Sequence, residues 1–384
     1  MRKSGKSMLG VKSFAVAILC GSLLSTPLAS ASTTVIPTSF ISLSQSPTLR
    51  NPGIVVIDPA TGQTIYQRGA NILRAPASVL KLISTTTALK TFGPDKRFTT
   101  TISETSDPAT FILTGGADPW LTASAYEAKK YHRAYLPTLI NKVLLDHPEL
   151  KAITLDYSNV YSTDIALLQH FFKGRVEITA AHLASSEGAS AQPTKVVESI
   201  ASPPLSEIIA FTLLYSDNVL ANRLAYSAAK QLGFASDATG VQAAFEKTLK
   251  ELGVESVGLH VEDGNGLSHA TRVSANTVGS LLVEIKKNPD LIDIYKGLPL
   301  AGKTGTLKVR FVNDAPKAVG LVRAKTGWID NTVSLAGFVT VGTKQYAFAF
   351  IANRIINRES ARSAARVTMD KMLATIARPA PKSS

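Results

Sequence analysis

Cysteine is almost absent from this chain. The single cysteine, Cys20, lies within the first 31 residues, so the remainder has no thiol. Disulfide bonds, thiolate zinc sites and a cysteine nucleophile are therefore excluded from that remainder. The six histidines show no paired spacing with carboxylates of the kind that binds a metal. We expect no metal site and no cofactor.

Long apolar runs are also lacking after the N-terminus. The chain begins with basic residues, continues through an apolar run at 14–24 and reaches small residues at 29–31. This order is typical of a secretory signal peptide, and its core is too short to span a bilayer. Leu19 is too large for a lipoprotein cleavage site before Cys20. We expect export to the periplasmic or extracellular cell-wall space, with no C-terminal membrane anchor.

Acidic residues are fewer than basic ones: the chain has 28 aspartates and glutamates and 41 lysines and arginines, which gives a formal net charge of +13. Clustered basic residues can bind nucleic acid, but neither a long basic run nor a basic motif interleaved with aromatics occurs. Export also argues against such a partner. We expect no nucleic-acid partner. Electrostatic association with an anionic cell envelope and a generally cationic surface without a dedicated partner both remain open.

The apolar pattern predicts strands near both ends of the chain and helices between them. Expected strands cover 53–57, 64–67, 319–325, 333–341 and 346–353. Expected helices cover 76–93, 136–145, 205–232, 241–252, 274–286 and 358–376. This arrangement predicts an α/β fold in which the two ends of the chain share one antiparallel sheet with helices on its faces.

Short strands and proline breaks set residues 98–204 apart from the rest. We therefore expect a signal peptide at 1–31, a main domain built from 32–97 and 205–377, and an inserted smaller domain at 98–204. Residues 378–384 are expected to form a disordered tail.

Ser78 and Lys81 lie three residues apart near the start of the expected helix at 76–93. This spacing puts the hydroxyl and the amine on one helix face, where the amine can take the hydroxyl proton. A helix N-terminus also directs N–H groups toward developing negative charge. A serine and a lysine three apart also occur by chance, so this pair alone indicates little.

Ser216-Asp217-Asn218 interrupts the apolar stretch at 205–232. All three residues are good helix N-caps, so a simple restart of the helix would account for their types. That explanation does not account for a break in the middle of an otherwise apolar pair of helices.

Lys325-Thr326-Gly327 is expected to end one strand just before the next begins. A polar hairpin turn is the plain alternative. The tripeptide also occurs at Lys303, but no β-rich run leads into that copy. We therefore favour Lys325. Ser-x-x-Lys, Ser-Asp-Asn and Lys-Thr-Gly in this order form a set typical of penicillin-binding proteins and class A β-lactamases.

The chain resembles the low-molecular-mass class C penicillin-binding proteins, the D-alanyl-D-alanine carboxypeptidase/endopeptidase family. The resemblance covers most of the chain beyond the signal peptide and includes further segments besides the three motifs. Those segments are 75–82, 115–119, 263–268, 302–307, 322–327 and 334–337. It implies a transpeptidase-like domain with a five-stranded antiparallel sheet and an inserted domain. The gap between the first two motifs is shorter than usual for the family, which predicts a trimmed insertion.

The resemblance also implies a serine peptidase that acts on peptidoglycan stem peptides and is acylated by β-lactams at Ser78. It assigns catalytic roles to Ser78, Lys81, Ser216, Asn218 and Lys325. It assigns substrate contacts to Asp217, Thr326, Gly327 and Trp328. Lys81 must be neutral to act as a base, and a positive charge on Lys325 would favour that form.

Three positions depart from the family pattern. Trp328 replaces the usual threonine or serine after Lys-Thr-Gly, so a hydroxyl contact to the substrate carboxylate is lost while the backbone N–H remains. Thr304 stands where aspartate is common, and Asn265 where serine is frequent. Trp328 puts substrate preference and rate in doubt more than the type of reaction.

Two other functions remain open. A β-lactamase would need a deacylating base, and the nearest candidate, Glu246, falls on a regular amphipathic helix and is expected to face solvent. A catalytically weak or inactive cell-wall-binding homologue is the other alternative, although the intact motif residues argue against decay.

Overall fold

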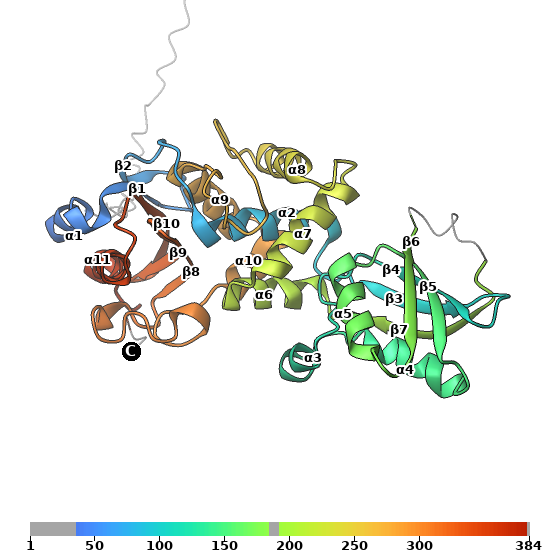
Figure 1. The fold of residues 1–384 in the computed structure, drawn as a ribbon. Coiled ribbons are helices and arrows are strands. Elements are labelled where there is room, and N and C mark those ends of the chain that lie inside the picture. The colour runs from blue at the N-terminus through green and yellow to red at the C-terminus, as the bar shows by residue number, and fades with distance from the viewer. Residues whose placement is uncertain (1–35, 184–191, 382–384) are drawn as a thin grey trace, which may run out of the picture. The chain divides into compact units, whose positions relative to one another are not determined.

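The computed structural model describes residues 36–183 and 192–381, and the predicted signal peptide lies outside them. Five strands form one antiparallel sheet in the order β2-β1-β10-β9-β8. Their bounds are β1 Asn51–Ile57, β2 Thr64–Arg68, β8 Val322–Ile329, β9 Thr332–Val341 and β10 Lys344–Asn353. β1 pairs directly with β10, so strands from the two ends of the chain share the sheet (Figure 1). The predicted five-stranded antiparallel sheet is confirmed.

Both faces of this sheet are covered by helices. Along β1, Ile54 and Val56 pack in one apolar cluster with α11 (Glu359–Ile376) and α1 (Thr38–Ser44). The alternate residues Val55 and Ile57 pack in a second cluster with α9 (Ala275–Lys287). Because successive side chains of a strand point to opposite faces, one continuous apolar run serves both clusters.

The second cluster also contains the helices that carry two of the motifs. Their bounds are α2 Lys81–Phe92, α6 Leu205–Tyr215, α7 Asn218–Gln231, α8 Ala238–Glu251 and α10 Ile292–Gly297. In α2 every residue from Lys81 to Leu89 is buried, which explains its lack of a polar face. The first turn of the predicted helix is instead a 3-10 turn, Ala77–Leu80, and the predicted helix at 205–232 breaks at Ser216.

A second, mixed sheet lies within the residues predicted for the inserted domain. Its order is β6-β5-β4-β3-β7, and β5 is parallel to both β4 and β6. The strands are β3 Thr99–Glu104, β4 Thr110–Gly115, β5 Ala152–Ser158, β6 Glu177–His182 and β7 Lys195–Ala201. The helices are α3 Ala125–Tyr131, α4 Pro137–Asp146 and α5 Ser162–Phe172. This sheet has its own apolar core, which α4 and α5 help to form.

Two local expectations differ from the structure. Lys325-Thr326-Gly327 lies inside β8 instead of ending a strand, because Trp328 and Ile329 continue the pairing with β9. Arg378, the first residue of the predicted tail, is held by backbone hydrogen bonds to Thr340 and Gly342. Order therefore extends at least to this residue. Across the described ranges, no helix is both long and apolar enough to cross a membrane.

A buried arginine joins the start of β1 and the end of β2 to the segment that precedes Ser78. Arg74 is 1% exposed, and its guanidinium donates to the carbonyl oxygens of Asn51, Gly69 and Ile72 over 2.7–2.8 Å. It also donates to Asn51 Oδ1 over 3.1 Å. The Arg74 backbone pairs with Val273. These bonds fix the start of β1 and the chain entering the Ser78 turn.

We predict that Arg74→Met lowers the free energy of unfolding by roughly 3 kcal/mol, because buried carbonyl groups lose their donors. Thermal unfolding followed by circular dichroism measures the loss. The control is Arg354→Met, which changes an exposed arginine. Equal stability of the two variants would contradict this role for Arg74.

Candidate active site

Ser78 lies on the 3-10 turn that leads into α2, and this turn is tied to the sheet. Ser334 Oγ of β9 donates to the carbonyl oxygen of Pro76 over 2.6 Å. Asn353 of β10 exchanges two hydrogen bonds with the backbone of Ala75. Ala77, the residue just before Ser78, has a backbone φ of 50°, an unusual value for a residue with a side chain. The position of Ser78 therefore depends on strands near the C-terminal end of the chain.

The amine of Lys81 lies at the centre of three oxygen acceptors. Its Nζ donates over 2.8 Å to Ser78 Oγ, to Asn218 Oδ1 and to the carbonyl oxygen of Asn265. Lys81 is fully buried. Burial lowers the pKa of Lys81 to about 7, although the charges of Asp263 and Asp217 oppose this change. Burial, rather than the charge of Lys325, is thus the main cause of the low pKa. Near neutral pH the amine is available to accept the proton of Ser78.

The Ser216-Asp217-Asn218 motif forms the elbow between α6 and α7. Ser216 has left-handed backbone angles, φ 59° and ψ 39°, which end α6. Asp217 accepts a hydrogen bond from Leu220 N over 2.9 Å and caps α7, as the plain alternative predicted. Asn218 is the first residue of α7 and directs its side-chain oxygen to Lys81. At this break a new helix, α7, begins, and its first residue, Asn218, lies beside the amine of Lys81.

Lys325 of β8 reaches the same elbow. Its Nζ donates to Ser216 Oγ over 2.8 Å and to the carbonyl oxygen of Thr326 over 2.7 Å. Burial, together with the charge of Lys81, holds the pKa of Lys325 well below its usual value. Lys303, in the second copy of the tripeptide, is exposed instead. The structure thus brings Lys325, and not Lys303, to the other two motifs.

Gly327 allows β8 to approach the turn that carries Ser78. A Cβ atom at this position would lie 2.3 Å from Ser334 Oγ and 2.9 Å from Ser78 N. Both distances are shorter than real Cβ contacts, so a residue with a side chain would push the strand away. The absence of a side chain therefore lets the backbone of β8 at Gly327 lie against the backbone N–H of Ser78.

A cleft of about 900 Å³ opens over these groups. Six of the residues singled out in the sequence line it, namely Ser78, Ser216, Asn218, Thr326, Gly327 and Trp328. Lys81 and Lys325 are buried, and Asp217 is not part of the lining. In the described part of the chain no three His, Cys, Asp or Glu side chains are arranged to hold a metal ion.

Several lining residues were not found from the sequence. They are Tyr215, Leu267, His269, Thr306, Val309, Arg310, Ile329, Asp330 and Arg366. Thr306 accepts a hydrogen bond from Thr326 Oγ1 over 2.9 Å, and the Arg362 guanidinium lies 5.4 Å from the centre of the Trp328 ring. Most of these residues stand alone on loops and carry no spacing signal, although Leu267 and Thr306 lie inside segments that contributed to the resemblance.

Curated relatives that extend over most of the chain include two carboxypeptidases. Carboxypeptidase DacB of Mycolicibacterium smegmatis is 28% identical over 358 residues, covering 79% of this chain and 78% of that protein. The D-alanyl-D-alanine carboxypeptidase of Actinomadura sp. is 24% identical and covers 78% of this chain and 77% of that protein.

Solved structures share the fold at low sequence identity. Penicillin-binding protein 4 (dacB) from Haemophilus influenzae has a TM-score of 0.71 at 18% identity, covering 88% of this chain and 98% of that one. The penicillin G-acylated predatory endopeptidase Bd3459 from Bdellovibrio bacteriovorus has a TM-score of 0.62 at 15% identity, covering 86% and 94%.

The family model described as D-Ala-D-Ala carboxypeptidase 3 (S13) matches residues 41–143 and 166–376, well over half of the chain. The predicted resemblance to low-molecular-mass class C penicillin-binding proteins is thereby confirmed. With the three motifs gathered around one cleft, the chain belongs to the D-Ala-D-Ala carboxypeptidase 3 (S13) family.

Proposed function

We propose that this protein is a serine D-Ala-D-Ala carboxypeptidase or endopeptidase that cleaves peptidoglycan stem peptides through an acyl-enzyme at Ser78. The hydrogen bond of 2.8 Å between Lys81 Nζ and Ser78 Oγ carries the proposal, because the amine there has a pKa of about 7. A buried amine that is neutral near pH 7 is a competent general base for a serine nucleophile. The names of the relatives support the same chemistry.

In the acylation step, Ser78 Oγ attacks the carbonyl carbon of the penultimate D-alanine while Lys81 takes the hydroxyl proton. The backbone N–H groups of Ser78 and Trp328 stabilise the oxyanion, and the closeness of Gly327 to Ser78 N supports this role. When the peptide C–N bond breaks, Ser216 passes a proton to the departing amine. Water then hydrolyses the ester and regenerates the Ser78 hydroxyl.

Lys325 and Thr326 receive the terminal carboxylate of the substrate. Burial disfavours the charged form of Lys325 in the free protein, and an arriving carboxylate would restore that charge by Coulomb attraction. Thr326 Oγ1 lies beside the cleft and donates to Thr306 in the free protein. Trp328 offers no hydroxyl, so the substrate carboxylate is bound by the charge of Lys325 and the hydroxyl of Thr326. Asn218 orients Lys81 and binds the substrate amide.

Glu246 does not support a β-lactamase of class A. It lies on α8, accepts a hydrogen bond from Gln242 and lines a separate hollow that lacks Ser78. An inactive wall-binding homologue would have no need for the three-way contact of Lys81. β-Lactams are therefore expected to act as covalent inhibitors.

The cell-wall compartment remains our proposal for the location, with electrostatic attraction of the cationic chain to the envelope.

A fluorescent penicillin should form a stable covalent adduct with the protein, and Ser78→Ala should abolish that adduct. Lys325→Ala should slow adduct formation strongly, whereas Lys303→Ala should leave it unchanged because Lys303 is exposed and outside the cleft. Gel fluorescence over time measures the adduct, and mass spectrometry of incubated muropeptides measures release of D-alanine. Labelling of Ser78→Ala would overturn the assignment of the nucleophile.

The acylation rate should depend on the protonation of Lys81. Below pH 7 the amine becomes charged, so the rate should fall about tenfold per pH unit. Asp217→Asn removes a charge that raises the pKa of Lys81 but keeps a good helix cap. The fall of the acylation rate at acidic pH, the acid limb of the pH–rate profile, should therefore occur at lower pH in this variant. A limb that stays in place or moves to higher pH in stopped-flow acylation would contradict this electrostatic contribution.

Gly327→Ala should slow acylation by roughly 10²-fold, because the added Cβ forces β8 away from Ser78 N and misplaces the oxyanion contacts. Thermal unfolding of the same variant shows whether the fold survives. A folded variant that acylates at the normal rate would show that the close approach is not needed for the reaction.

A further inference from the structure

The elbow between α6 and α7 needs support from outside the two helices. Ser216 adopts left-handed backbone angles that a residue with a side chain takes at an energetic cost. Such a conformation persists only where the surroundings fix it. The elbow also carries Asn218, which must lie within 2.8 Å of the Lys81 amine.

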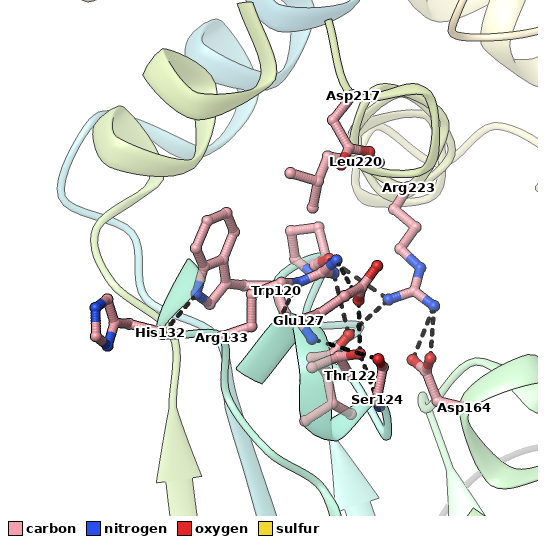
Figure 2. A network of polar contacts seen from close by, with 12 residues as sticks. Trp120, Thr122, Ser124, Glu127, His132, Arg133, Asp164, Asp217, Leu220 and Arg223 are labelled. Carbon is pink, nitrogen blue, oxygen red and sulfur yellow. Dashed lines mark hydrogen bonds and ion pairs between the residues drawn. The ribbon is translucent and has the colours of Figure 1, made fainter. Parts of the chain in front are cut away.

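Arg223 extends from α7 into the segment that follows β4. Its Nη1 donates to the carbonyl oxygen of Leu121 over 2.9 Å, and its Nη2 lies 2.8 Å from each carboxylate oxygen of Asp164 (Figure 2). The guanidinium carbon also lies 4.1 Å from the centre of the Tyr161 ring. Arg223 and Asp164 are 8% and 4% exposed. The pair therefore joins α7 to α5 in a buried environment.

The segment that receives Arg223 is itself held rigidly. Arg133 donates to the carbonyl oxygens of Pro119, Trp120 and Leu121 over 3.1–3.3 Å (Figure 2). Arg133 also donates to Glu127 over 2.9 Å. Arg133 thus binds three successive carbonyl groups, and Arg223 also binds two of them, those of Pro119 and Leu121. The segment can therefore serve as a fixed support.

The same segment contacts α6, the other helix of the elbow. The Trp120 ring meets Phe211 edge-on with centroids 5.0 Å apart. The ring centroid of Tyr131 lies 5.1 Å from that of Phe211 and 6.3 Å from that of Tyr215, the residue that precedes Ser216. Both helices therefore rest on residues 119–131, one through aromatic contacts and the other through Arg223.

The first turns of α7 also hold the loop that completes the environment of Lys81. Asn222 Oδ1 accepts from Gly264 N over 2.8 Å, and the carbonyl oxygen of Asn218 accepts from Asn265 Nδ2 over 3.4 Å. Asn265 supplies its own carbonyl oxygen to Lys81. A shift of α7 would consequently disturb two of the three acceptors of the amine.

We propose that Arg223 is a positioning residue, which together with Asp164 braces α7 and keeps Asn218 and Asn265 on the amine of Lys81. A buried ion pair adds little stability compared with apolar side chains of similar size, because both ions must leave water. Its effect here is to fix where the helix lies. The proposal rests on the proposed function, since it concerns the efficiency of the same site.

The test compares acylation by a fluorescent penicillin, its pH dependence and thermal unfolding in matched variants. Arg223→Met should slow acylation at least about tenfold, because small displacements of catalytic groups cost this much or more. The acid limb of the pH profile should also shift, since Lys81 loses a defined partner. Arg223→Lys should recover part of the rate. Val143→Ala, a core change in α4, should lower the unfolding temperature while the acylation rate stays unchanged.

The variant Arg223→Met/Asp164→Leu separates positioning from stability. Replacing both partners by apolar residues removes the unpaired buried carboxylate, so the unfolding temperature should recover while acylation stays slow. Recovery of the normal rate together with stability would overturn the proposal.

Hydrogen exchange of peptides covering residues 212–224 gives a readout that does not depend on activity. Arg223→Met should increase amide exchange in this stretch. Unchanged exchange would contradict the proposal that Arg223 and Asp164 hold α7 in place. If the unaltered protein forms no penicillin adduct, the proposed function fails, while the exchange result still decides whether Arg223 holds the elbow.

Discussion

The amine of Lys81 draws its three acceptors from three separate parts of the chain. Ser78 belongs to the same helical segment, Asn218 to the elbow and Asn265 to a loop between helices. Burial favours the neutral form, in which the amine has two N–H donors for Asn218 and Asn265 and accepts the hydrogen bond from the Ser78 hydroxyl. These contacts keep the amine in one place. Two other features act on the residues around the amine: the left-handed Ser216 ends α6 just before Asn218, and Gly327 lets β8 lie against Ser78 N.

The sheet and the helices contribute to this arrangement in different ways. β9 and β10 hold the turn before Ser78 through Ser334 and Asn353. The helices bring in Asn218, and β8 brings in Lys325, whose amine contacts Ser216. Burial, together with the charge of Lys81, disfavours the charged form of Lys325, so an anion bound beside Lys325 would favour its protonation.

The three motifs could be found from the sequence because their spacing and order are specific, and the sheet because β1, β9 and β10 are rich in apolar and β-branched or aromatic residues. The interruption at Ser216 could also be seen, but its left-handed geometry could not. The boundary of β8 was missed since strand ends depend on pairing, here between Ile329 and Thr332. Residues such as Arg223 carried no signal, because their partners lie far away in the chain and only the fold brings them together.

The pairing of β1 with β10 has a consequence for the order of events during biosynthesis. Asn51 lies opposite Asn353, about three hundred residues later, so the sheet closes only when nearly the whole polypeptide is present. Contacts of such long separation form slowly. Because Ala75 is held by Asn353, the turn that carries Ser78 reaches its final geometry only after the last strand has been added. A nascent or truncated polypeptide that lacks β10 also lacks the two hydrogen bonds of Asn353, so the turn before Ser78 is not held in the geometry of the complete fold.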